Sequence, residues 1–224
     1  MVATSTRSEN VYERLRTDIL IGKLAAGSKL RVETLSRDYG ASSGVIREAL
    51  PRLVGQGLAV SLPRHGVSVV SIGAEDLRFL TEARVHIEVL VLRMAVRHGA
   101  IDWESRLLAS HHELSRTEIH SSDGEVSQTW LTAHAQFHRA LLEGCPNTRL
   151  KDLASTLRDS AEVYRCWSDK TGGADKRNIA EEHQRICDLA LARDANAAAK
   201  ALKDHIELTT DMILKSQSSS VPAT

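Results

Sequence analysis

The chain has 224 residues, enough for one large domain or two modest ones. Its 8 aromatic residues (2 Phe, 3 Tyr and 3 Trp) argue against an all-β sandwich or barrel. A net charge of zero argues against a nucleic-acid-binding protein, but the charge is unevenly distributed: residues 1–73 carry 10 Lys and Arg against 6 Asp and Glu, and residues 74–224 carry 19 against 23. A basic part of charge +4 is therefore joined to an acidic part of charge −4.

The sequence has no stretch of about 18 apolar residues, so we expect no membrane-spanning helix. Residues 1–7 also lack the apolar run of a signal peptide. Three widely spaced cysteines, Cys145, Cys166 and Cys187, form no Cys-x-x-Cys pair and are expected to be reduced. Together these features predict a cytoplasmic protein.

The first 73 residues have the pattern of a winged helix-turn-helix domain. Apolar residues at helical spacing predict three helices, and two β-branched runs flank a turn that contains Pro63 and Gly66. In chain order, we expect helices at 9–22, at 32–39 and from Ser42 or Ser43 onward, then strands at 57–62 and 67–71. The turn between the second and third helices makes this a candidate DNA-binding domain.

From residue 75 onward, the strand signals disappear and helical periodicity continues. We expect helices at about 74–97, 102–119, 125–143, 147–168, 178–192 and 195–215, with Asp102, Asn147 and Asp194 as N-terminal caps. Short loops predict an antiparallel bundle over residues 74–215, followed by a disordered tail at 216–224. The predicted fold class is mainly α: a winged helix-turn-helix at 1–73 joined to a bundle of about six helices.

Motifs in the N-terminal part resemble those of the gluconate-repressor-type (GntR) transcription factors. Residues 22–30, GKLAAGSKL, are similar to the family's Gly-x-Leu-x-Pro-Gly-x-x-Leu connector, and residues 42–50, SSGVIREAL, to its recognition-helix signature Ser-Arg-Thr-Pro-Val-Arg-Glu-Ala-Leu. Ser43-Gly44-Val45 replaces Arg-Thr-Pro, so one expected DNA-contacting arginine is missing. Pro51 stands where the family has a helix former, and we expect it to kink or shorten the third helix at a cost of about 3 kcal/mol.

The C-terminal part resembles the FadR-type ligand domain of that family, called FCD. The matching residues are Arg84 with Glu88, Phe137-His138, Glu182-His183 and His205. The resemblance implies a bacterial transcription regulator that acts as a repressor and is not an enzyme. It also implies a homodimer on a pseudo-palindromic double-stranded DNA operator, whose affinity a small organic acid changes.

Eight residues of the N-terminal part are candidates for contacting DNA: Arg31, Ser42, Ser43, Gly44, Arg47, Arg64, His65 and Gly66. A recognition helix enters the major groove by its first turns, where Arg47 can donate to O6 and N7 of a guanine. Arg64 and His65 at the wing tip can reach the minor groove or the backbone. The alternative is that these are solvated surface residues. A charge of only +4 supplies few phosphate contacts, so tight binding requires a dimer on two half-sites.

Four histidines are expected to point into the core of the bundle. His134 and His138 are four residues apart on one helix, and His183 and His205 lie on apolar stripes of two other helices. A single histidine on an apolar face is more often a hydrogen-bonded core residue, but four converging imidazoles are hard to satisfy without a metal. The family usually has Asp at the position of His134, and imidazole there favours Zn²⁺, or Ni²⁺, over Mn²⁺ or Mg²⁺.

Arg84 lies on the inward face of its helix, where arginine rarely occurs without an anionic partner. It can form an internal ion pair with Glu88, or it can bind the carboxylate of an effector that also fills open positions on the metal, as the resemblance implies. Arg165 is a second candidate for the same cavity.

Two other functions use the same histidines. One is a metal sensor with a structural or regulatory metal. The other is a metal-dependent hydrolase. The hydrolase is disfavoured because no Glu or Asp has general-base spacing to the histidines, and because a fourth histidine tends to close the coordination shell.

Overall fold

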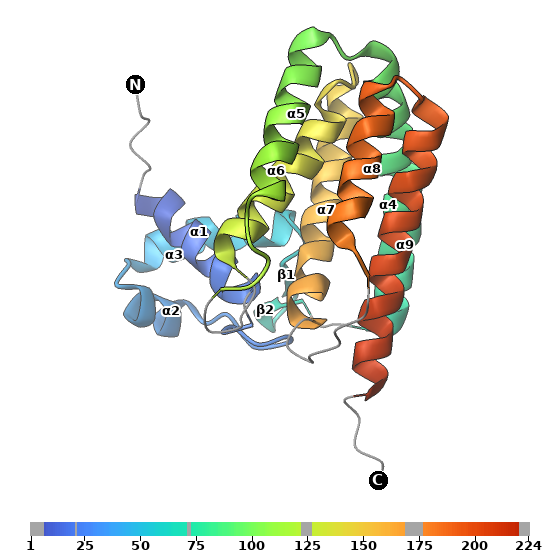
Figure 1. The fold of residues 1–224 in the computed structure, drawn as a ribbon. Coiled ribbons are helices and arrows are strands. Elements are labelled where there is room, and N and C mark those ends of the chain that lie inside the picture. The colour runs from blue at the N-terminus through green and yellow to red at the C-terminus, as the bar shows by residue number, and fades with distance from the viewer. Residues whose placement is uncertain (1–6, 21, 71–72, 122–126, 169–176, 220–224) are drawn as a thin grey trace. The chain divides into compact units, whose positions relative to one another are not determined.

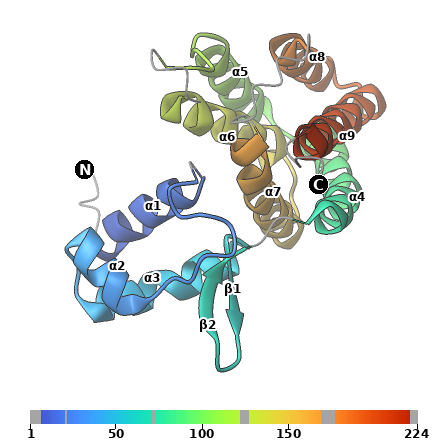
Figure 2. The same ribbon diagram turned by 90° about the horizontal axis from the view of Figure 1, so that it is seen from below.

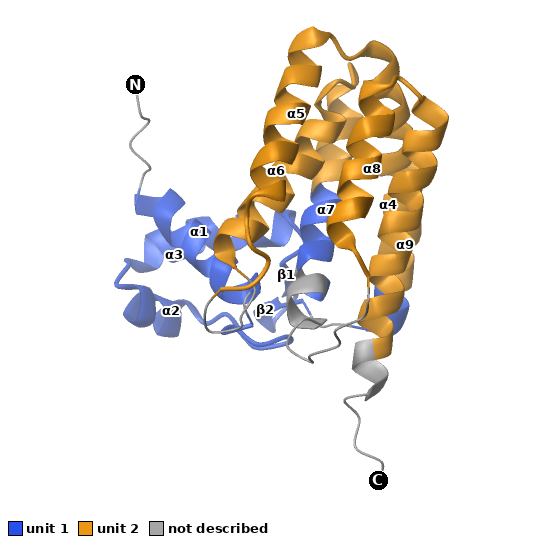
Figure 3. Cartoon of the chain, viewed as in Figure 1, with its two compact units in different colours: residues 1–77, 156–167 blue, residues 78–155, 168–224 orange. Residues whose placement is uncertain are grey.

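The structure is a computed structural model that describes residues 7–20, 22–70, 73–121, 127–168 and 177–219, and the backbone alone at 163, 165–168 and 216–219. The chain divides into two compact units (Figure 3). Unit 1 combines Met1–Leu77 with Thr156–Trp167, and unit 2 combines Arg78–Ser155 with Ser168–Thr224. One segment far along the chain therefore belongs to the N-terminal unit.

Unit 1 contains the predicted winged helix-turn-helix (Figure 2). Its elements are α1 (Arg7–Leu20), α2 (Val32–Tyr39), α3 (Ser43–Gly55), β1 (Ala59–Leu62) and β2 (Gly66–Val69). The strands pair antiparallel, with Leu62 opposite Gly66 at the turn. Helix α1 packs on α3, and Leu15, Ile19, Ile46 and Leu53 form a fully buried core between them. The predicted three helices and hairpin are thus confirmed.

The start and the course of α3 follow from local chemistry. Ser42 is the N-cap, and its hydroxyl accepts a hydrogen bond from the Val45 N–H. The helix continues through Pro51 to Gly55, so the expected shortening at Pro51 is wrong. The proline removes one hydrogen bond, to the Arg47 carbonyl, on an exposed face, while Leu50 and Leu53 on either side are buried and hold the helix in place.

Helix α7 (Thr148–Ser168) contributes its second half to unit 1, where it contacts the segment between α3 and β1. Ser160 donates from its hydroxyl to the Gln56 carbonyl at 3.1 Å. Gly57 has a φ of +69°, and a Cβ atom built on it would lie 2.1 Å from the Ser160 Oγ. Both the backbone conformation and the close approach of α7 therefore require glycine here.

We expect Gly57→Ala to lower the free energy of unfolding by about 1–3 kcal/mol, because alanine disfavours positive φ and displaces the Ser160 hydroxyl from Gln56. Urea denaturation measures this change. Ser160→Ala removes the clashing oxygen, so the double variant should lose less stability than the two single variants added together. If the stability losses of the two single variants simply add up in the double variant, the close contact between position 57 and Ser160 does not contribute to stability.

Unit 2 is the predicted antiparallel bundle (Figure 1). Its helices are α4 (Ala74–His98), α5 (Ile101–Ser115), α6 (Gln128–Glu143), the first half of α7, α8 (Ile179–Leu191) and α9 (Ala195–Ser219). Close packing joins α5 to α6, α8 to α9 and α5 to α8. The first four residues of α4, Ala74–Leu77, are grouped with unit 1. Within the described ranges, no helix combines the length and apolarity that crossing a membrane requires.

Two of the three predicted caps are confirmed: Asn147 accepts from the Leu150 N–H, and Asp194 accepts from the Ala197 N–H. The third is wrong, since α5 begins after Ala100, and Asp102 lies in its first turn, where it pairs with Arg106. The prediction of a disordered tail from residue 216 is also corrected, because α9 extends to Ser219. Residues 220–224 lie outside the described residues.

Candidate functional site

The four predicted histidines come together in the core of unit 2. His134 and His138 lie one turn apart on α6, and His183 on α8 and His205 on α9 face them; all four are buried. One ring nitrogen from each lies within 4.8 Å of the other three. The local cause is the helical repeat, which puts each imidazole on the same stripe as buried apolar residues such as Phe137, Ile186 and Leu202.

The donor set fits a divalent transition metal. The Nε2 atoms of His134 and His138 are 3.2 Å apart, close to the roughly 3.3 Å edge of a tetrahedron whose nitrogens lie about 2.0–2.1 Å from Zn²⁺. The largest separation in the group is longer than this edge, so small rotations of the rings must bring the remaining nitrogens closer. Four imidazoles are ligands that zinc, nickel and copper accept well.

A carboxylate and a guanidinium lie directly behind His205. The His205 Nδ1 atom lies 2.7 Å from the Glu182 carboxylate. Arg177, two residues before α8, donates to both oxygens of Glu182 at 2.6 and 2.5 Å and to the backbone carbonyl of His205 at 3.1 Å. The side chains of Arg177 and His205 are 10% and 7% exposed, so this ion pair is shielded from water.

The burial and the ion pair determine the charge of these groups. Burial lowers the pKa of the His205 imidazole below its usual value and outweighs the hydrogen bond with Glu182, which acts in the opposite direction. Burial alone would raise the pKa of Glu182, but hydrogen bonds with Arg177 and His205 lower it to about 2. At neutral pH, a neutral imidazole therefore faces an ionised carboxylate, and the neutral form is the one that binds metals.

Arg84 forms the ion pair with Glu88 that was one of its two predicted roles. Its Nε donates to the Glu88 carboxylate at 2.6 Å and its Nη2 at 3.5 Å, and Glu88 is only 1% exposed. Arg84 is also near enough to His205 to act on its pKa electrostatically. The side chain of Arg165, the second effector candidate, lies outside the described residues.

All eight DNA-contact candidates are exposed on unit 1: Arg31, Ser42, Ser43, Gly44, Arg47, Arg64, His65 and Gly66. Arg31 precedes α2, the serines and Gly44 open α3, and Arg47 follows one turn later. At the wing tip, Arg64 and Gly66 have positive φ values of 65° and 78°, which form the turn. The structure thus presents the start of α3 and the wing as two polar, solvent-exposed surfaces.

Residues 7–69 match the family described as bacterial regulatory proteins, gntR family, and residues 80–208 match the FCD domain. The HTH-type transcriptional regulator BphR of Paraburkholderia xenovorans is 35% identical over 207 residues, which cover 92% of this chain and 84% of that protein. The HTH-type transcriptional repressor GlaR of Escherichia coli is 30% identical over 201 residues, which cover 87% and 90%. The chain belongs to the GntR family.

This GntR-family protein is a bacterial DNA-binding transcriptional regulator and not an enzyme. The relatives and families that it matches are transcriptional regulators too. Its fold agrees with solved structures. Escherichia coli McbR/YncC has a TM-score of 0.76 at 17% identity, over 95% of this chain and 99% of that one. A GntR regulator from Rhodococcus sp. RHA1 has a TM-score of 0.69 at 21% identity, over 93% and 98%.

Two residues beside the cluster of this GntR regulator, Arg177 and Glu182, were not predicted from the sequence to belong to the site. Glu182 could have been suspected because it precedes His183 in the first turn of α8. Arg177 carries no such signal, since the residues it contacts on α9, His205, Thr209 and Met212, are 28 to 35 residues away in sequence.

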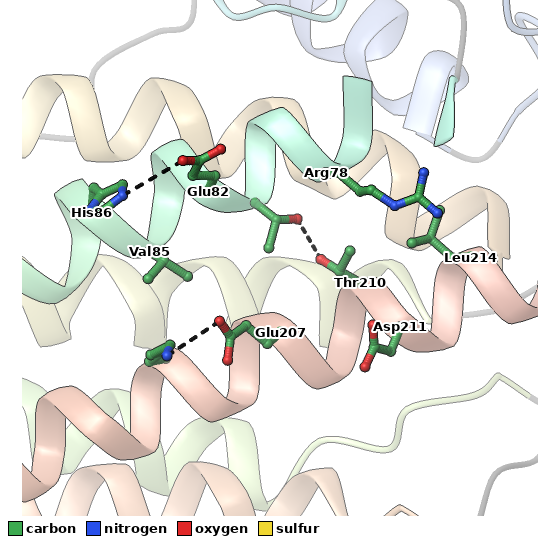
Figure 4. A pocket seen from close by; sticks show the side chains of 10 residues that line it. Arg78, Glu82, Val85, His86, Glu207, Thr210, Asp211 and Leu214 are labelled. Carbon is green, nitrogen blue, oxygen red and sulfur yellow. Dashed lines mark hydrogen bonds and ion pairs between the residues drawn. The ribbon is translucent and has the colours of Figure 1, made fainter. Parts of the chain in front are cut away.

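A separate cleft of about 490 Å³ lies between α4 and α9 of the regulator (Figure 4). The hydroxyls of Thr81 and Thr210 bridge the two helices at 2.6 Å, and the cleft walls carry charges of both signs. Neither Arg84 nor any residue of the histidine cluster lines this cleft. The cleft and the candidate metal site are therefore distinct features of unit 2.

Proposed function

We propose that this protein is a ligand-responsive repressor in which a small carboxylic acid binds a metal held by His134, His138, His183 and His205 and thereby changes operator affinity. The observation that carries this proposal is the cluster of four buried ring nitrogens within 4.8 Å of one another. Buried imidazoles need polar partners, and a metal supplies one partner to all four at once.

The charges around the cluster favour an anionic ligand. The four imidazoles are neutral donors, and the nearby charged side chains occur in pairs that cancel, Arg177 with Glu182 and Arg84 with Glu88. A divalent ion in the cluster would therefore keep its full charge of +2 in a buried place. A carboxylate effector would compensate this charge, and a metal that accepts more than four ligands has positions for it.

Zn²⁺ is the leading identity of the metal and Ni²⁺ the second. Hard ions such as Mg²⁺ and Mn²⁺ prefer oxygen ligands, whereas imidazole nitrogen suits zinc and nickel. The described cluster contains no carboxylate ligand, which argues further against the hard ions.

The proposed DNA-binding form is a homodimer on a pseudo-palindromic operator. Each N-terminal part has a net charge of only +4, and two copies double the number of phosphate and base contacts. Arg47 at the start of α3 would read bases, and Arg64 and His65 at the wing tip would contact the minor groove or the backbone. Arg31 would face a phosphate or a base edge.

Operator affinity should differ between the zinc-bound protein with and without an effector by about 5- to 150-fold, the range of ordinary allosteric coupling. Gel shifts on the upstream DNA of its own gene measure this, with apo-protein, Zn²⁺ alone, and Zn²⁺ with a panel of small mono- and dicarboxylic acids. A failure to form any specific complex at moderate salt would contradict DNA binding at this operator. A specific complex that no acid changes would contradict the effector.

The variant Arg84→Met/Glu88→Gln separates the two roles of Arg84, because it removes both charges and leaves no buried carboxylate unpaired. If Arg84 binds the effector carboxylate, this variant should still bind Zn²⁺ and operator but lose its response to the acid. An unchanged response would assign Arg84 to the internal ion pair alone.

A metal-sensing regulator is the second candidate, because four histidines are enough to close a tetrahedral shell around zinc without an effector. In that case Zn²⁺ alone should change operator affinity, and no acid should add to the change. Chelation that melts unit 2 without an acid response would indicate a metal with a purely structural role.

A further inference from the structure

Arg177 uses its whole hydrogen-bonding capacity around His205. Nε and Nη2 donate to the two oxygens of Glu182, and Nη2 also donates to the His205 carbonyl. Nη1 donates to the Thr209 hydroxyl at 2.9 Å and contacts the Met212 sulfur at 3.7 Å. Because a guanidinium has five N–H groups, these five contacts leave none for a ligand. Arg177 is therefore a positioning residue and not a binding one.

The same contacts decide which nitrogen of His205 carries the proton. Arg177 Nη2 lies 3.2 Å from His205 Nδ1, which is the longest of its three polar contacts, after those with Glu182 and the His205 carbonyl. The Glu182 oxygen 2.7 Å from Nδ1 is an ionised acceptor and requires a hydrogen there. The 2.7 Å contact therefore favours the His205 tautomer that has its hydrogen on Nδ1 and its lone pair on Nε2.

The Nδ1 atom of His205 is in this way occupied by Glu182 and Arg177, which leaves Nε2 as the nitrogen available to the cluster. The His205 ring lies 5.3 Å from the ring of His138 and 4.8 Å from that of His183, measured between centroids. Arg177 also ties the start of α8, which carries His183, to the segment of α9 that carries His205. Both effects act on His183 and His205, and not on the two histidines of α6.

We propose that Arg177 and Glu182 form a clamp that holds His205 in its metal-binding tautomer and so sets how tightly the metal is retained. This inference rests on the proposed metal-dependent function. A carboxylate behind a metal-binding histidine orients the ring and makes the imidazole a stronger ligand, and losing such a partner costs about 10- to 100-fold in metal affinity.

Glu182→Gln in the full-length protein tests the clamp, because it keeps the shape of the side chain and removes its charge. Its matched control is Glu181→Gln, the same change one residue earlier on an exposed position of α8. Competition with a chromophoric chelator measures Zn²⁺ affinity, and nitrogen-15 NMR of the histidine rings in the metal-free protein reports the tautomer of His205. A role in packing alone would not move the tautomer.

We expect the wild type to show His205 protonated on Nδ1 only, and Glu182→Gln to show a mixture of tautomers and about 10- to 100-fold weaker Zn²⁺ binding. Glu181→Gln should stay within about twofold of the wild type. Arg177→Lys keeps the charge but not the five-donor fork, so it should weaken Zn²⁺ binding in the same direction and serves if Glu182→Gln does not fold.

Equal Zn²⁺ affinity of Glu182→Gln and Glu181→Gln, or a wild-type His205 protonated on Nε2, would overturn the clamp and leave the proposed function intact. A wild type that binds neither Zn²⁺ nor Ni²⁺ would overturn the metal-dependent function, and the clamp with it.

Discussion

Arg47→Ala is expected to weaken operator binding by about 2–6 kcal/mol in a homodimer, because each half-site would lose one bidentate contact to guanine worth about 1–3 kcal/mol. Arg47 is exposed on α3, one turn after the Ser42 cap, so its removal leaves no cavity and no unpaired buried charge. Fluorescence anisotropy with labelled operator measures the loss. Metal content and melting temperature should not change.

Two control variants make this prediction specific. Arg37→Ala removes the same charge from the same unit, but Arg37 is exposed at the end of α2 and is paired with Asp38. It should weaken binding only slightly and equally for specific and random DNA. Glu48→Ala alters the exposed neighbour of Arg47 on α3 without removing a cation. If Arg47→Ala binds operator as tightly as Arg37→Ala does, Arg47 does not read bases.

His138→Ala and His183→Ala are expected to lose the metal, each weakening Zn²⁺ binding by about 100-fold or more. The estimate follows from a total metal-binding free energy of about 10–16 kcal/mol shared among four ligands. Both variants test the centre of the cluster, since the rings of His138 and His183 each neighbour the rings of the other three histidines. Elemental analysis of purified protein and chelator competition measure the loss.

His111→Ala is the matched control for the histidine variants. His111 is also a buried histidine of unit 2, and its ring packs edge-on against Phe137 at 5.5 Å, but it is not in the cluster. It should lower the melting temperature without changing metal content. Full metal occupancy in His138→Ala would contradict the proposed site, whereas metal loss in His111→Ala would show that general destabilisation causes the effect.

The Arg47 and His138 variants change different units, so each should affect one property, DNA binding or metal binding, without the other. Arg47 lies in unit 1 and the histidine cluster in unit 2. Arg47→Ala should weaken specific DNA binding and retain metal. His138→Ala should lose metal and any response to an effector, and retain basal contacts with DNA through the unchanged winged helix.

Most of the elements and the four clustered histidines could be predicted from the sequence. The winged helix follows from local sequence signals, such as the cap residue Ser42 and the turn residue Gly66, which has a positive φ in the structure. The spacing of His134 and His138 places both on one face of any helix that contains them. Periodicity and capping depend on hydrogen bonds and side chains about four residues apart, so they can be read without knowledge of the fold.

The contacts between residues far apart in the chain could not be predicted in this way. The division of α7 between the two units, with Ser160 against Gly57, joins segments more than 100 residues apart. Likewise, Arg177 reaches the carbonyl of His205 because α8 and α9 pack side by side. Such contacts depend on how helices pack, which no local pattern specifies. The sequence therefore predicted the four histidines of the cluster, and only the packing of α8 on α9 brought Arg177 and Glu182 to His205.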